Sequence, residues 1–74
     1  MSADIDRATL KSTTLAKAEY WARTAQLLLD FRDCSRYIYF GVPNHLFTAL
    51  LQAPSHGAFF NREIRNRYAY VRIA

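Results

Sequence analysis

The length of the chain is the feature that most limits what it can fold into. At 74 residues it has room for one domain, because a unit of about 60 residues buries only about 60% of the surface that its unfolded chain exposes. A cleft that encloses a substrate would use residues that so small a core can hardly spare. We therefore expect a binding module and not an enzyme.

The composition indicates a chain that folds without covalent cross-links. Apolar residues make up 51% of the chain and aromatic residues 15%, well above what disordered chains show. Cys34 is the single cysteine, so neither an intramolecular disulfide nor a cysteine-based zinc site can form, which fits a reducing, cytoplasmic location. The first eleven residues form no apolar signal sequence, and no apolar run approaches the roughly 20 residues that span a bilayer. We expect neither secretion nor a membrane.

Residues 1–11 are polar and include Asp4, Asp6, Arg7 and Lys11. Such a segment buries little apolar surface, so we expect a flexible N-terminal arm. The alternative is a short helix that forms on a partner.

Residues 12–42 predict three short strands, with breaks near residues 21–24 and 32–35. In the second strand Ala25, Leu27, Leu29 and Phe31 fall on one face, opposite Gln26, Leu28 and Asp30, which makes theirs the core face. The third strand, residues 36–40, is aromatic and β-branched.

Two prolines mark a change to helical spacing. Pro43 suits a helix start, and the apolar residues after it repeat every three or four positions, which predicts a helix over 43–53. Pro54 ends that helix, and Ser55 is a suitable N-cap for a second one that continues to about residue 65. Residues 68–73 alternate again and predict an extended segment that packs along the sheet or the helix.

Together these segments predict an α+β fold. We expect a three-stranded antiparallel meander sheet, two helices packed on one face, and a short extended C-terminal segment.

Several motifs occur in one order along residues 12–73: Tyr37-Ile38-Tyr39, Val42-Pro43, Ala53-Pro54-Ser55-His56-Gly57, Phe59-Phe60-Asn61, and Ile64-Arg65 with Tyr68-Ala69-Tyr70. Their joint order and spacing resemble the KTSC domain, a family named for its place at the C-terminus of some lysyl-tRNA synthetases and also found as stand-alone proteins. The resemblance implies a KTSC-like domain over residues 12–74, no catalytic residues, and a proposed role in RNA binding. It leaves the arm over residues 1–11 unexplained.

Positive charge is concentrated near the C-terminus. Residues 58–74 hold four arginines and one glutamate, a net charge of +3, out of +4 for the whole chain. Arginine makes bidentate contacts with phosphate and carboxylate groups and stacks on rings, which suits RNA or an acidic protein surface. A solvated, solubilising face is the alternative.

The aromatic residues also allow two interpretations. Tyr37 and Tyr39 point to the same side of a strand, where with Arg36 they could form a platform for unpaired bases, or they could be core packing with satisfied hydroxyls. Trp21 is either a core residue or an exposed contact at an interface.

The candidate residues for binding a protein partner or RNA come from the arm, the third strand and the C-terminal segment. They are Arg7, Lys11, Arg36, Tyr37, Tyr39, Arg62, Arg65, Arg67, Tyr68, Tyr70 and Arg72.

Catalytic, metal and cofactor sites are not expected. Nothing in the sequence places Cys34 beside His45 or His56. Neither histidine has a second metal-ligating residue nearby at the spacing typical of a metal site. Ser55 and Gly57 could form an anion site at a helix N-terminus, but we expect an N-cap and a conformational joint, which are the commoner roles.

The expected function is that of a small transcription regulator. Stand-alone chains of this size and motif set resemble a small bacteriophage regulator that binds the host's bacterial RNA polymerase and acts in antitermination. We expect a protein that alters termination or initiation in this way, with arginines that contact the nascent RNA. The alternative is a direct RNA-binding module that uses the tyrosines and arginines. In either case we expect a protein that is a monomer on its own.

Overall fold

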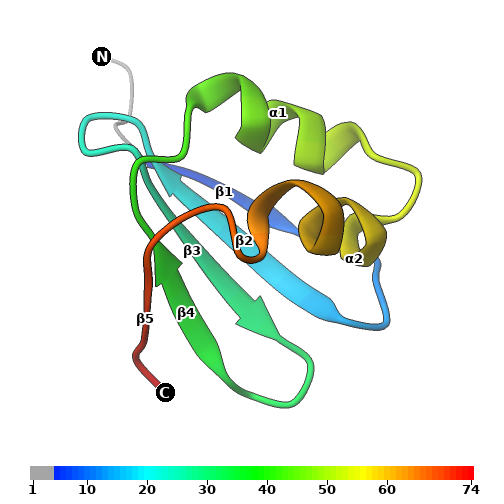
Figure 1. Ribbon diagram of the computed structural model, residues 1–74. Coiled ribbons are helices and arrows are strands. Elements are labelled where there is room, and N and C mark those ends of the chain that lie inside the picture. The colour runs from blue at the N-terminus through cyan, green and yellow to red at the C-terminus, as the bar shows by residue number, and fades with distance from the viewer. Residues whose placement is uncertain (1–4) are drawn as a thin grey trace.

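The computed structural model describes residues 5–74 and shows one sheet with two helices on one of its faces (Figure 1). The sheet has five antiparallel strands in the order β1-β2-β3-β4-β5. The elements are β1 (Ile5–Thr9), β2 (Leu15–Trp21), β3 (Gln26–Phe31), β4 (Arg36–Tyr39), α1 (Asn44–Gln52), α2 (His56–Phe59), η1 (Phe60–Ile64) and β5 (Tyr70–Arg72). Within these residues no helix is long and apolar enough to cross a membrane.

The core lies between the helices and the sheet. Leu27 and Leu29 alternate on β3 and are fully buried, as the spacing of that strand predicts. The helices supply the other side of the core, chiefly through Phe47, Leu50 and Ile64. This burial of apolar side chains is the main source of stability in so small a domain.

Tyr20 connects the sheet to the start of the first helix. Its ring stacks on Phe47 with centroids 5.1 Å apart, and its hydroxyl donates to the carbonyl oxygen of Val42 at 2.6 Å. Burial raises the pKa of Tyr20, because a phenolate would lose its hydration there. The hydroxyl therefore remains a neutral donor.

The expectation of an α+β fold is confirmed, but the expectation of three strands is wrong. One additional strand is β1, whose residues lie in the segment predicted to be a flexible arm. It pairs with β2 from Ile5↔Trp21 to Thr9↔Lys17, and the following Leu10 is buried. Backbone hydrogen bonds to β2 and the buried Leu10 hold this polar edge strand in place. Its side chains therefore show little of the apolar alternation from which a strand is predicted. Residues 1–4 of the predicted arm lie outside the described residues.

The other additional strand is β5, which comes from the predicted extended segment. It pairs with β4, with Tyr37 opposite Arg72 and Tyr39 opposite Tyr70. The pairing continues past its ends, where Ile73 N donates to the carbonyl of Arg36 at 2.8 Å. The C-terminus thus forms the edge of the sheet opposite β1.

The observed helix boundaries agree closely with those predicted from Pro43 and Pro54. Pro43 is the N-cap of α1, and Ser55 caps α2 by accepting from Ala58 N at 3.2 Å. Gly57 lies close to Thr14, and a Cβ at position 57 would be only 3.1 Å from Thr14 Oγ1. The glycine is therefore explained by this close contact and not by an unusual backbone angle. The second helix continues as the π-helical turn η1.

Candidate functional site

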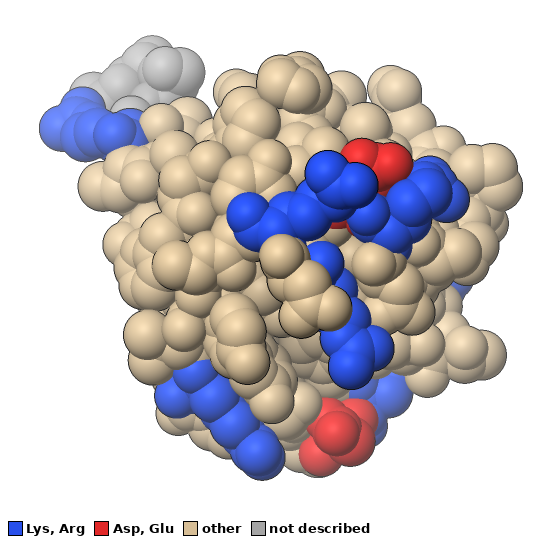
Figure 2. Space-filling view, viewed as in Figure 1, with Lys and Arg blue, Asp and Glu red and all other residues tan. Residues whose placement is uncertain are grey.

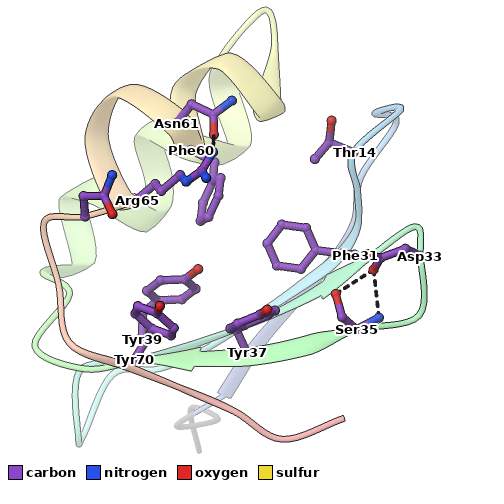
Figure 3. A pocket seen from close by; sticks show the side chains of 11 residues that line it. Thr14, Phe31, Asp33, Ser35, Tyr37, Tyr39, Phe60, Asn61, Arg65 and Tyr70 are labelled. Atoms are coloured by element: carbon purple, nitrogen blue, oxygen red, sulfur yellow. Dashed lines mark hydrogen bonds between the residues drawn. The ribbon is translucent and has the colours of Figure 1, made fainter.

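An open groove runs between the end of the second helix and the β4–β5 part of the sheet (Figure 3). Its volume is about 420 Å³, a size typical of small-ligand sites. It is lined by Thr14, Phe31, Asp33, Ser35, Tyr37, Tyr39, Phe60, Asn61, Arg65, Asn66 and Tyr70.

Aromatic rings make up the floor and one wall of this groove. Phe31, Tyr37, Tyr39 and Phe60 form a closed circuit of neighbouring rings, with centroids 5.4 to 6.3 Å apart. Tyr70 adds a fifth ring, 5.7 Å from Tyr37 and 5.6 Å from Tyr39. Figure 3 shows the tyrosines on the sheet side and Phe60 reaching down from the helix. Such a surface offers ring faces and edges to a flat ligand.

Strand geometry explains why the three tyrosines gather. Successive side chains alternate across a strand, so Tyr37 and Tyr39 share the face of β4 that looks toward the helices. The register of β5 places Tyr70 beside Tyr39 on that face. It also brings Arg72 beside Tyr37, with the guanidinium 5.9 Å from the ring centroid, a cation–π distance.

The two ends of the groove carry different polar groups. At the helix end Arg65 follows η1, and its guanidinium donates to Asn61 Oδ1 at 3.4 Å. At the opposite end Asp33 Oδ1 accepts from the Ser35 hydroxyl at 2.6 Å and from Ser35 N at 3.0 Å. The hydrogen bonds from Ser35 lower the pKa of Asp33, because they favour the ionised carboxylate. The groove is therefore cationic at one end and anionic at the other.

Tyr39 lies at the boundary between the core and the groove. Only 4% of the residue is exposed, and burial, followed by the neighbouring Tyr37 and Tyr70, raises its pKa to about 12. The hydroxyl is thus neutral at physiological pH and able to donate a hydrogen bond as well as accept one. The sequence left open whether the Tyr-x-Tyr pair is core or binding surface; Tyr39 is buried and Tyr37 is half-buried, and both line the groove.

A basic patch adjoins the helix end of the groove. We define it as Arg62, Arg65 and Arg67, all exposed. Arg62 pairs with Glu63 at 3.0 Å and lies over the Phe59 ring, while Arg67 Nε donates to the carbonyl of Arg62 at 3.1 Å. Figure 2 shows basic side chains gathered over this part of the molecule beside an acidic group.

The other residues assigned to binding lie away from the groove. Arg7 and Arg36 are on the opposite face of the sheet, where they pair with Glu19 at 2.7 Å and Asp30 at 2.8 Å. The hydrogen bond and charge of Asp30 raise the pKa of Arg36. Alternation along β4 separates Arg36 from the tyrosines with which it was expected to form a platform.

Two further assigned residues do not line the groove. Lys11 is exposed in the loop after β1. Tyr68 is half-buried against the core.

Sequence reasoning missed five polar residues that line the groove: Thr14, Asp33, Ser35, Asn61 and Asn66. The spacing of Asn61 and Arg65, four residues apart on a helix, is the one signal that links two residues of this end. Asn66 has a φ of 66°, a conformation that asparagine tolerates better than most residues. It follows Arg65, the C-cap of η1, on the way to β5.

Cys34 and His56 have local structural positions outside the groove. Cys34 is exposed in the β3–β4 turn with a φ of 73°. His56 Nδ1 lies 2.8 Å from the carbonyl oxygen of Leu50 at the end of α1, so it ties the two helices together.

Trp21 is half-buried at the end of β2, on the sheet face away from the helices. Its indole nitrogen is enclosed and has no hydrogen-bond partner among residues 5–74. The lone tryptophan is thus part of neither the helix-covered core nor the groove.

The geometry defines a small α+β domain with an aromatic groove at one edge of its sheet, and comparison with known proteins gives the family. The KTSC domain model matches residues 11–68, so the chain belongs to the KTSC domain family. The crystal structure of a KTSC domain protein from Yersinia pestis is similar, with a TM-score of 0.90 and 26% sequence identity over 95% of this chain and 99% of that one. A comparison with curated proteins found no match.

Proposed function

We propose that this protein binds single-stranded RNA, with unpaired bases in the aromatic groove and phosphates on the arginines beside it. The observation that carries the proposal is the convergence of Tyr37, Tyr39 and Tyr70 in an open groove whose helix end carries Arg65. Single-stranded nucleic acids are bound in this way, by rings on which bases stack and by cations that follow the backbone. A cytoplasmic location agrees with this class of ligand.

The polarity of the groove supports one orientation of the ligand. The phosphates lie toward Arg65 and the basic patch, because the opposite end carries the ionised Asp33 and would repel them. The bases lie over Tyr70 and the half-buried Tyr37, because Tyr39 is only 4% exposed. Amino or imino groups on a base edge can donate to the carboxylate of Asp33.

The direct test is fluorescence anisotropy of short labelled RNAs of mixed sequence with Tyr70→Ala and Arg65→Gln. Tyr70 is 56% exposed, so its truncation leaves the core intact, and we expect the loss of one stacked ring to weaken binding by about 1–3 kcal/mol, or roughly fivefold to 160-fold. Arg65→Gln is expected to make the salt dependence shallower by about 0.7 in the log–log slope. Arg7→Gln, the same change of charge on the other sheet face, is the matched control.

The outcomes separate clearly. Retained affinity in both groove variants, or equal losses in Arg7→Gln and Arg65→Gln, would show that RNA does not use the groove. Failure of all RNAs to bind at low salt would reject RNA binding altogether.

The basic patch favours a second proposal, the regulator that binds bacterial RNA polymerase and alters termination or initiation. Three exposed arginines with one neighbouring acid suit an acidic protein surface as well as RNA. A domain docked in this way could hold the nascent transcript in its groove and disfavour a terminator hairpin.

Binding to purified bacterial RNA polymerase in the presence of nuclease tests this second proposal. We expect binding that is lost when Arg62, Arg65 and Arg67 are all changed to Gln and kept in Arg7→Gln. Absence of binding by the unmodified protein, or binding that nuclease abolishes, would contradict it and leave the RNA proposal in place.

A further inference from the structure

The face of the sheet that the helices leave uncovered carries a continuous apolar patch. The register places Leu28, Ile38 and Val71 side by side across β3, β4 and β5, and alternation places Trp21, Phe40 and Ile73 on the same face. We call these six residues the open-face patch. In Figure 1 both helices lie on the other side of the sheet.

Much of this patch is in contact with water in the single chain. Val71 is 51% exposed, Ile73 46% and Phe40 37%. Leu28 is only 6% exposed although no helix covers it, so the side chains around it already pack closely. Exposed apolar groups that are contiguous, and not scattered singly, mark a surface at which another molecule is bound.

The charged residues of the same face are almost balanced. Arg7 pairs with Glu19 at 2.7 Å and Arg36 with Asp30 at 2.8 Å, and Lys17 lies opposite Asp30 in the strand register. The face therefore selects neither an acidic nor a basic partner. The basic patch, which would repel a second copy of this chain, adjoins the groove on the other face of the sheet.

We propose that the open-face patch docks against the same patch of a second copy, with the two sheets packed face to face. A two-fold arrangement uses the same residues on both copies, and a nearly neutral apolar surface can meet itself without charge repulsion. Strands about 4.8 Å apart with a rise of about 3.3 Å per residue give the whole five-strand face an area of about 400 Å² per copy, which is below the roughly 1,000 Å² in total of a stable specific interface. The area predicts a weak dimer that dissociates on dilution, so the monomer expected from the sequence is the form at low concentration.

Sedimentation velocity over a wide range of protein concentration tests the proposal. We expect the sedimentation coefficient of the unmodified chain to rise from the monomer to the dimer value. Val71→Glu places a buried charge in the interface and is expected to keep the protein monomeric throughout. Tyr70→Glu is the matched control, because it adds the same charge to the neighbouring position of β5 but on the groove face, and we expect it to dimerise as the unmodified chain does.

A second measurement reports on the patch itself. Trp21 is the only tryptophan in the chain, so a blue shift of its emission is expected as the concentration rises, and no shift in Val71→Glu. A monomer at all concentrations would overturn the proposal. So would a dimer that survives Val71→Glu, or one that Tyr70→Glu disrupts equally, since the latter would indicate pairing of β5 edges. Circular dichroism of both variants establishes that they are folded.

Discussion

Tyr39 shows how one residue can serve the core and the groove together. Its ring belongs to the buried cluster, while the residue also lines the groove. The sequence identified Tyr37 and Tyr39 as one unit because their spacing of two puts them on the same side of a strand. How deeply each ring is buried depends on Phe60 and Tyr70, which come from other elements.

The raised pKa of Tyr39 predicts a loss of stability in alkali. Its pKa is about 12 in the folded protein and about 10 in an unfolded chain, so the unfolded state loses its proton first as the pH rises. The contribution to stability is complete below pH about 10 and is lost between pH about 10 and 12, by at most about 1.4 kcal/mol per pH unit. Denaturant unfolding measures the free energy of unfolding at each pH. Over this range it should fall less steeply with pH in Tyr39→Phe than in the unmodified chain.

Tyr20 extends this prediction, because burial raises its pKa as well. The free energy of unfolding should therefore fall least steeply with pH in the double variant Tyr20→Phe, Tyr39→Phe. Equal slopes in the unmodified chain and in Tyr39→Phe would contradict the assignment to Tyr39.

At the scale of elements, the second helix depends on the N-cap residue before it and on the loop between β1 and β2 that Gly57 approaches. Ser55 provides the N-cap, as the sequence predicts, because a cap is a contact between residues three apart. The role of Gly57 was not predictable, since the atoms that it approaches belong to Thr14, more than forty residues earlier in the chain.

Removal of the cap has a predictable cost. Ser55→Ala leaves the Ala58 N–H without its side-chain acceptor, and we expect the free energy of unfolding to fall by about 0.5–2 kcal/mol. Chemical denaturation measures this change. Thr48→Ala, which removes a hydroxyl from an exposed position inside α1, is the control and should be neutral or slightly stabilising, because alanine favours helices. A similar loss in both variants would argue against capping.

At the scale of the whole molecule, the two faces of the sheet have separate tasks in our proposals. One face, with the helices, forms the groove, and the other carries the open-face patch. A dimer formed through the patch leaves both grooves accessible, so a long RNA can occupy two of them.

This arrangement predicts a difference between short and long RNAs. At concentrations where the dimer forms, Val71→Glu should bind a short RNA as the unmodified chain does but bind a long RNA about tenfold or more weaker, because it loses the second contact. Titration of both RNAs by anisotropy measures the effect. Equal affinity of the two proteins for the long RNA would show that the sites do not act together.

The sequence by itself determined the features that depend on near neighbours. The alternation of Leu27 and Leu29, the proline at the start of the first helix and the cap at Ser55 are all read within a few residues, and the structure confirms each of them. The motifs along residues 12–73 also resembled the family, and the KTSC domain model matches residues 11–68.

Only the tertiary structure decided which distant segments lie together. The pairings of β1 with β2 and of β4 with β5 rest on backbone hydrogen bonds, which every residue but proline can make and which therefore leave little trace in side-chain patterns. Those two pairings complete the sheet. They also place Tyr70 and Arg72 beside the Tyr-x-Tyr pair and Arg7 on the other face of the sheet, because these contacts join segments that are far apart in the chain.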